Sequence, residues 1–113
     1  MNTVYVVQNV RMRNHHTGEF EDKYNFQKAS IYGNVKIILT SDRTSPLVPS
    51  PAIFQLQQAL KNFSDEDYLL PVGNPAFVAA AGAIAAKNNG GRFKMLIWDK
   101  RAASYIESPI QIK

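Results

Sequence analysis

The sequence has 113 residues, of which 45% are hydrophobic, 19% charged and 11% aromatic. This composition predicts one folded domain over residues 1–113 and excludes a disordered tail. The absence of cysteine excludes disulfides, zinc thiolates and thiol chemistry. A net charge of +4 is basic, but it falls short of the charge density of a protein that coats DNA.

Signals for export or membrane insertion are not apparent in the sequence. Residues 1–10 contain no cationic leader before an apolar run. The longest apolar stretch, residues 75–86, is far shorter than the ~20 residues that span a bilayer. We therefore expect no membrane partner, and we expect the protein to stay in the compartment where it is made.

The first half of the chain predicts two strands and a short helix. Alternating apolar residues indicate a strand over residues 3–13, followed by a polar turn at residues 14–18; residues 19–25 are too polar to place. A helix of at most two turns is expected over residues 26–32, ended by a left-handed Gly33. The almost continuous apolar run of residues 35–40 predicts a strand buried on both faces, inside the sheet.

The middle of the chain predicts two helices, each opened by a proline. Ser50 is expected to cap the first helix and Pro51 to occupy its first position, with apolar residues at helical spacing over about three turns. Residues 68–72 indicate another buried strand. Asn74 and Pro75 then open an alanine-rich helix that runs to about residue 87.

The C-terminal segment predicts a β-hairpin of residues 92–99 and 104–112, with Pro109 marking the last strand as an edge. Strands that alternate with helices require crossover connections. The expected fold is therefore α/β: a single layered domain with a mixed, largely parallel sheet of about five strands, covering helices and a C-terminal hairpin.

Three loops are expected to share one edge of this sheet, because the carboxyl ends of parallel strands lie together and form the ligand crevice. They contain Asp42 and Arg43, then Gly73 and Asn74, then residues 99–101. Free N–H groups at the start of the following helix would attract a phosphorylated ligand or nucleotide. The alternative is a tight strand-to-helix turn without a ligand, since both a dinucleotide fingerprint and a Walker loop are missing.

Positive charge is concentrated near the C-terminus: residues 1–67 hold seven basic and seven acidic side chains, and residues 68–113 hold six and two. Arg92, Lys94 and Trp98 share a strand face, and Lys100 and Arg101 follow. Cations beside an aromatic platform are typical of single-stranded nucleic-acid binding. The alternative is that Trp98 packs under a helix while the cations reach solvent.

No catalytic or metal-binding set is predicted. His15 and His16 are adjacent in a turn, so their side chains point apart, whereas metal ligands need wider spacing. The acidic segment 64–67 precedes a strand, at the wrong end of the sheet for a crevice site, and is interpreted as a solvated turn. No nucleophile–base pair is visible. We expect no enzymatic activity, no metal and no cofactor.

The segment from Phe63 to Asn74, the alanine-rich helix after it, and residues 89–101 with Tyr105 and Ile106 resemble a family of small proteins encoded by tailed bacteriophages. The resemblance extends from Phe26 onward. Family members often have Asp where this chain has Asn74, and either residue caps a helix. The resemblance implies a phage product that works in an infected bacterial cell, in the host cytoplasm or in the virion, but implies no particular activity.

The sequence therefore predicts a non-enzymatic phage accessory protein that binds a macromolecule, a host or phage protein in the first place and nucleic acid as the alternative. An exposed outer face of the alanine-rich helix would favour a homodimer. The candidate binding residues are Asp42, Arg43, Gly73, Asn74, Arg92, Lys94, Trp98, Lys100 and Arg101.

Overall fold

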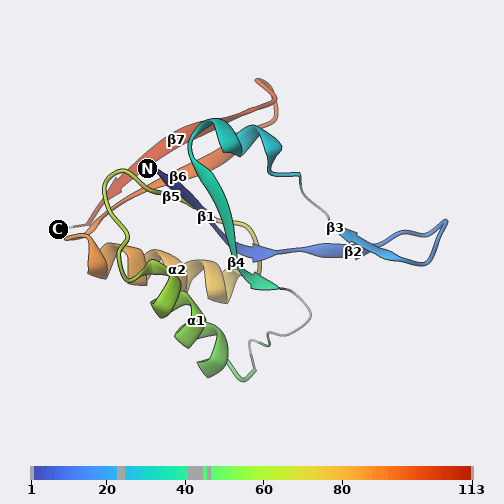
Figure 1. Ribbon diagram of the computed structural model, residues 1–113, viewed down its shortest axis with the longest axis horizontal. Helices are drawn as coiled ribbons and strands as arrows, with labels where there is room; N and C mark the ends of the chain where they lie inside the picture. The colour runs from blue at the N-terminus through green and yellow to red at the C-terminus, as the bar shows by residue number, and fades with distance from the viewer. Residues whose placement is uncertain (1, 23–24, 41–44, 46, 113) are drawn as a thin grey trace.

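The computed structural model of the chain describes residues 2–22, 25–40, 45 and 47–112. It contains a five-stranded mixed sheet in the order β4-β1-β5-β6-β7 and a separate two-stranded hairpin, β2-β3 (Figure 1). The elements are β1 (Thr3–Asn9), β2 (Arg11–Arg13), β3 (Phe20–Asp22), the 3-10 helix η1 (Gln27–Ile31), β4 (Asn34–Thr40), α1 (Ser50–Leu60), β5 (Tyr68–Leu70), α2 (Pro75–Asn88), β6 (Arg92–Asp99) and β7 (Ser104–Gln111). Strands β4, β1, β5 and β6 are parallel and β7 is antiparallel, which confirms the predicted fold class.

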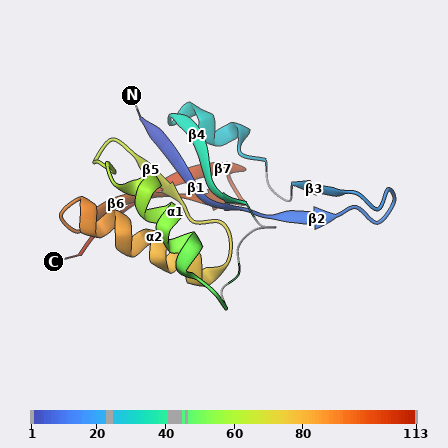
Figure 2. The same cartoon turned by 60° about the horizontal axis from the view of Figure 1, so that its bottom comes forward.

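Both α-helices lie on one face of the sheet (Figures 1 and 2). Val7 of β1, Leu56 of α1 and Phe77 of α2 are at most 1% exposed and belong to one core cluster. Burial of side chains of this size stabilises the fold by about 1.5–3 kcal/mol each. The two helices therefore pack directly on β1 and β5 over this core.

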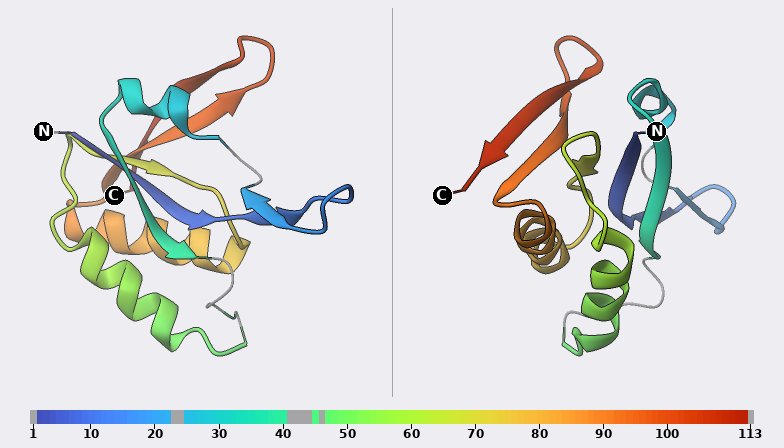
Figure 3. Two further views of the ribbon diagram at one scale, coloured as in Figure 1. Left: turned by 45° about the vertical axis from the view of Figure 1, so that its right-hand side comes forward. Right: turned by 60° about the vertical axis from the view of Figure 1, so that its left-hand side comes forward.

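The opposite face of the sheet has a smaller cover. Val4 and Val6 of β1 are fully buried there with Leu70 of β5 and Leu96 of β6. Ala29 of η1 belongs to the same cluster, and Figure 3 shows η1 on the side of the sheet away from the α-helices. Because η1 has only five residues, part of this face is left open toward the end of β6.

The second predicted strand is present but lies at an edge. The prediction that residues 35–40 sit inside the sheet is wrong, since β4 pairs only with β1 and Ile37 is 41% exposed. The central positions belong to β1 and to the three-residue strand β5, all of whose side chains are buried. A continuous apolar run indicates burial in general, but it does not give the strand order.

Residues 3–13 do not form one strand, which corrects the prediction for this segment. After β1 the chain leaves the sheet, and β2 pairs with β3 in a hairpin that projects from the body of the molecule (Figure 1). All three side chains of β2 are exposed. The alternation of apolar and polar residues in β1 therefore continues through residues 10–13, although the side chains of β2 do not contribute to the core.

Helix boundaries differ from the prediction in small ways. Helix α1 begins at Ser50, so Pro49 occupies the cap position and Ser50 does not cap. The Asn74 cap and Pro75 start of α2 are confirmed. Gly33 follows η1 with a φ of +158°, which is not the predicted left-handed cap; a Cβ there would lie only 2.5 Å from the carbonyl oxygen of Asn2.

Candidate functional site

The carboxyl ends of the parallel strands lie along one edge of the sheet, as predicted. Gly73 and Asn74 follow β5, and Lys100 and Arg101 follow the neighbouring strand β6. The predicted site residues Asp42 and Arg43 lie outside the described residues. The described part of the chain therefore brings together two of the three predicted loops.

The direction in which the chain adds parallel strands to the sheet reverses between β1 and β5. From β1 the chain goes on to β4 on one side, and from β5 it goes on to β6 on the other side. In open α/β sheets this is the usual place for a ligand. Here Gln8 occupies it. Its side-chain Oε1 accepts a hydrogen bond from the N–H of Asn74 (2.7 Å), and its own N–H donates to the carbonyl of Val72 (3.0 Å). Only 6% of Gln8 is exposed, so this residue fills the crevice between the two strand ends.

The start of α2 is occupied by its own cap. The Oδ1 atom of Asn74 accepts from the N–H of Ala76 (2.9 Å), and the carbonyl of Asn74 accepts from Phe77 and Val78 (both 3.0 Å). Pro75 has no N–H to offer. The expectation of free N–H groups at this helix end is therefore wrong, and these atoms leave no donor for a phosphate in the first turn.

A pocket opens one strand further along the same edge, between the ends of β5 and β6 on the sheet face opposite the α-helices. Its volume is about 610 Å³. Its walls are formed by Asn25, Leu70, Pro71, Val72, Gly73, Leu96, Ile97, Trp98, Lys100 and Tyr105. We call it the carboxyl-edge pocket. It joins Gly73, Trp98 and Lys100 of the predicted site in one mainly apolar cavity.

Trp98 forms a wall of this pocket and is 43% exposed. Its ring meets that of Tyr105 edge to face, with centroids 5.1 Å apart, and the Nζ atom of Lys28 lies 5.6 Å from its centroid. Lys28 also donates to the carbonyl of Ala103 (2.8 Å), and the hydroxyl of Tyr32 donates to the carbonyl of Tyr105 (3.0 Å). Helix η1 is thus tied to the β6–β7 hairpin. Neither sequence alternative for Trp98 describes this arrangement, since no α-helix covers the ring.

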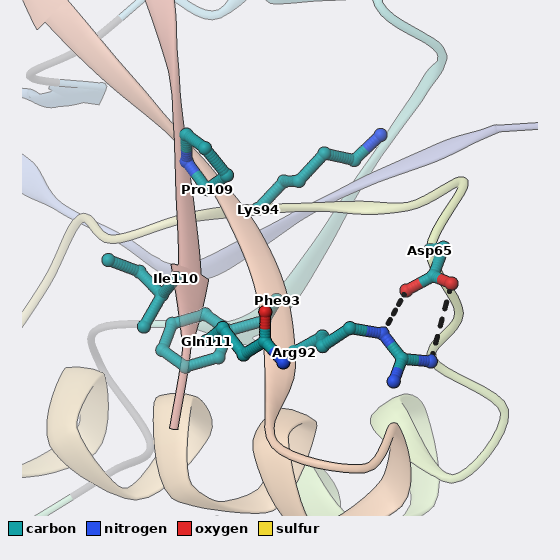
Figure 4. Close-up of a pocket in the computed structure, with 7 residues that line it drawn as sticks. All are labelled: Asp65, Arg92, Phe93, Lys94, Pro109, Ile110 and Gln111. Atoms are coloured by element: carbon teal, nitrogen blue, oxygen red, sulfur yellow. Dashed lines mark hydrogen bonds and ion pairs between the residues drawn. The ribbon is translucent and has the colours of Figure 1, made fainter. Parts of the chain in front are cut away.

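Arg92 and Lys94 lie toward the opposite end of β6. Arg92 and Lys100 are eight positions apart along extended chain, a distance of roughly 25 Å. Arg92 Nε is 3.1 Å from Oδ1 of Asp65, an exposed ion pair beside a second cavity of about 440 Å³ (Figure 4). Hydrogen bonds from Arg92 and Asn89 lower the pKa of Asp65 below its usual range. Arg92 therefore connects the start of β6 to the turn before β5.

Lys94 is directed at a tyrosine rather than at open solvent. Its Nζ atom lies 4.4 Å from the ring centroid of Tyr68, at the distance of a cation–π contact. The Tyr68 hydroxyl donates a hydrogen bond to Glu107 of β7. This bond, together with burial, raises the pKa of Tyr68 to about 12. The seven described residues of the predicted set are thus divided between two ends of the sheet: Arg92 and Lys94 lie at one end, and the other five lie at the carboxyl edge.

The histidines and the acidic turn take no part in the carboxyl-edge pocket. His15 and His16 are exposed in the turn between β2 and β3. Asp67 is only 7% exposed and accepts hydrogen bonds from the backbone of Thr3 and Ser64. The interpretation of segment 64–67 as a solvated turn is therefore wrong for Asp67, although Asp65 and Glu66 are exposed. Within the described ranges, no three histidine or acidic side chains form a metal-binding group.

Residues 2–112 match the family described as Phage Pam3 gp32-like protein. The chain belongs to this phage protein family. No curated protein and no solved structure matched it. The match confirms the phage origin that the resemblance of residues 63–106 implied. In the described part of this phage protein, no helix is long and apolar enough to cross a membrane.

Sequence reasoning missed several residues at this edge of the sheet, among them the polar and aromatic side chains of Gln8, Asn25, Lys28 and Tyr105. Lys28 and Tyr105 are far apart in the chain. Tyr105 pairs with Trp98 across the β6–β7 hairpin, and Lys28 reaches the same ring because η1 contacts β7. Gln8 gave a weak signal as a polar residue at the end of an otherwise apolar strand. A polar residue that is buried at such a position needs a hydrogen-bond partner.

Proposed function

We propose that this phage protein is a non-enzymatic accessory protein that binds a macromolecular partner, a host or phage protein, in the cytoplasm of the infected cell. The observation that carries the proposal is the carboxyl-edge pocket. It is large enough for a bulky side chain, is lined mainly by apolar residues, and has a half-exposed tryptophan in its wall. Aromatic residues in pockets of this kind often dominate binding energy at protein interfaces.

Exposed apolar residues elsewhere on the surface support a binding role. Large side chains that are more than 40% exposed include Met12 and Phe20 of the projecting hairpin and Ile106 of β7. Single exposed apolar residues are common on protein surfaces, but contiguous ones are typical of interfaces. The projecting hairpin offers a further surface that the body of the protein does not cover.

The test is capture of partners from a lysate of phage-infected bacteria on the immobilised full chain, after nuclease treatment. We expect one or a few polypeptides, identified by mass spectrometry, that are retained by the wild type and lost with the Trp98→Ala variant. The matched control Phe54→Ala removes an exposed aromatic side chain from α1 and should retain them. A wild-type sample that retains no polypeptide beyond a blank resin would contradict the proposal.

Nucleic acid is a second candidate, and it is supported by the group of cations around Trp98. Lys28 lies over the ring, Lys100 lines the pocket, and Arg101 is exposed next to it. Binding of this kind weakens steeply as salt concentration rises. Fluorescence anisotropy of a labelled oligothymidine between low and physiological salt measures that dependence, and absence of binding at low salt would remove this candidate.

A further inference from the structure

The carboxyl-edge pocket has a chemical character that defines its partner more narrowly. Four of its ten lining residues have a side-chain nitrogen or oxygen atom: Asn25, Lys100, Tyr105 and Trp98. The other six are apolar residues or glycine. The floor is formed by Leu70 and Leu96, each 1% exposed. A cavity of about 610 Å³ with this lining suits one large apolar side chain and the backbone beside it.

The rim of the pocket is positively charged. Lys100 lines it, Lys28 lies over the Trp98 ring, and Arg101 is exposed after Lys100. No carboxylate is among the described lining residues. The neighbouring Asp99 accepts a hydrogen bond from the backbone N–H of Arg101 (3.0 Å), so it is engaged within the hairpin turn. A partner that fits this rim carries negative charge on either side of its apolar group.

The geometry around Trp98 favours a protein segment over a stacked base. Stacking needs an open ring face. Lys28 lies over the Trp98 ring, and it is held there because its ammonium group also donates to the carbonyl of Ala103. Tyr105 contacts the ring edge to face, with an interplanar angle of 72°. A base that stacked on the ring face near Lys28 would have to displace this side chain, whereas an apolar side chain can enter the pocket beside the ring without displacing it.

We infer that the carboxyl-edge pocket binds a segment of a protein partner in which one large apolar or aromatic residue is flanked by Asp or Glu. The apolar residue fills the cavity between Leu70, Leu96 and Trp98. The flanking carboxylates lie near Lys28, Lys100 and Arg101. The inference rests on the proposed partner-binding function and assigns that partner its chemistry.

The test is selection of random twelve-residue peptides by mRNA display on the immobilised full chain. We expect enriched peptides to share one aromatic, leucine or methionine residue within three positions of an Asp or Glu. Anisotropy with an enriched peptide should then show a loss of affinity of at least roughly thirtyfold for Trp98→Ala, the size of a typical interface hot spot. Val72→Phe, which fills the cavity and keeps every cation, should give a similar loss.

Charge reversal gives an independent readout that does not depend on the pocket's shape. In the double variant Lys100→Glu and Arg101→Glu, selection should enrich peptides whose apolar residue is flanked by Lys or Arg. The control Lys61→Glu changes an exposed cation at the end of α1 and should keep the preference for acidic flanks. All variants are checked for native far-ultraviolet circular dichroism and cooperative unfolding.

Three outcomes would overturn the inference: no shared pattern in the selected peptides, acidic flanks that persist after charge reversal, or peptide binding that Val72→Phe leaves unchanged. Binding of labelled oligothymidine that Trp98→Ala and Lys100→Glu abolish would overturn it in favour of nucleic acid. If infected-cell polypeptides are still captured in a Trp98-dependent way while peptide selection fails, the inference fails and the proposed function stands.

Discussion

The side-chain oxygen of Gln8 lies 2.7 Å from the backbone nitrogen of Asn74 and accepts its hydrogen bond. This contact joins the end of β1 to the turn that leads from β5 into α2. It closes the crevice where a ligand of an open α/β sheet usually binds, and the pocket found at this edge lies one strand away, between β5 and β6.

Replacing Gln8 with alanine should destabilise the protein. The N–H of Asn74 would lose its acceptor in a partly buried position, which costs about 1–3 kcal/mol in the free energy of unfolding. Urea denaturation followed by circular dichroism measures this. Gln57→Ala, at an exposed position of α1, should change stability by no more than ~0.5 kcal/mol. Equal effects of the two substitutions would show that the Gln8 contact does not stabilise the turn.

Two glycine-to-alanine substitutions should change the stability of the protein in opposite directions. Gly73 has a φ of +127°, and a Cβ there would lie 2.5 Å from Cβ of Gln8, so Gly73→Ala should cost about 1–3 kcal/mol for the backbone alone and more for the overlap. Gly82 lies within α2, and its Cβ would meet Phe93 at an ordinary 3.7 Å. Gly82→Ala should therefore stabilise the protein by up to about 1 kcal/mol. Thermal and urea unfolding of both variants check the signs, and a neutral Gly73→Ala would contradict this account.

The tyrosine titration should have a late step. Because the pKa of Tyr68 is raised to about 12 in the folded protein, against 10.0 for an ordinary tyrosine, Tyr68 stabilises the fold fully below pH 10, and this contribution is lost as the pH rises toward 12. Ultraviolet absorbance of tyrosinate should show the last ionisation near pH 12 while the protein remains folded. Glu107→Gln removes the charged acceptor and should bring this step to lower pH. A step that Glu107→Gln and Tyr68→Phe both leave in place would assign it to another tyrosine.

Helix α2 should mediate self-association. Its buried side packs Phe77, Ala81 and Ala85 into the core, while Ala79 and Ala83 are exposed on its outer side. We expect light scattering at micromolar concentration to give the mass of two chains. Ala83→Glu should raise the dissociation constant at least roughly tenfold, because a charge would be buried in the interface. Gln57→Glu on α1 is the matched control. A wild-type mass of one chain would contradict the expectation.

Local patterns in the sequence determined much of the architecture. The Asn74–Pro75 helix start, the spacing of apolar residues in α1 and the paired strands 92–99 and 104–111 depend on interactions between residues close in the chain. The alternation of helices and strands required crossover connections, and this gave the parallel sheet and its shared carboxyl edge. For the same reason, the sequence predicts Gly73 and Lys100 at one edge of the sheet whatever the strand order.

Only the tertiary structure decided which residues form the site. Strand order placed β1 in the centre and β4 at an edge. The alternation of residues 11–13, which is typical of a strand in the core, belongs to the exposed strand β2 of the projecting hairpin. The predicted strand 92–99 already separates Arg92 from Lys100 along the chain, but only the packing made Asp65 the partner of Arg92 and Tyr68 the partner of Lys94. Lys28 reaches Trp98 across some seventy residues of sequence. Contacts of this kind depend on how the elements pack, and side-chain periodicity along a single element does not contain that information.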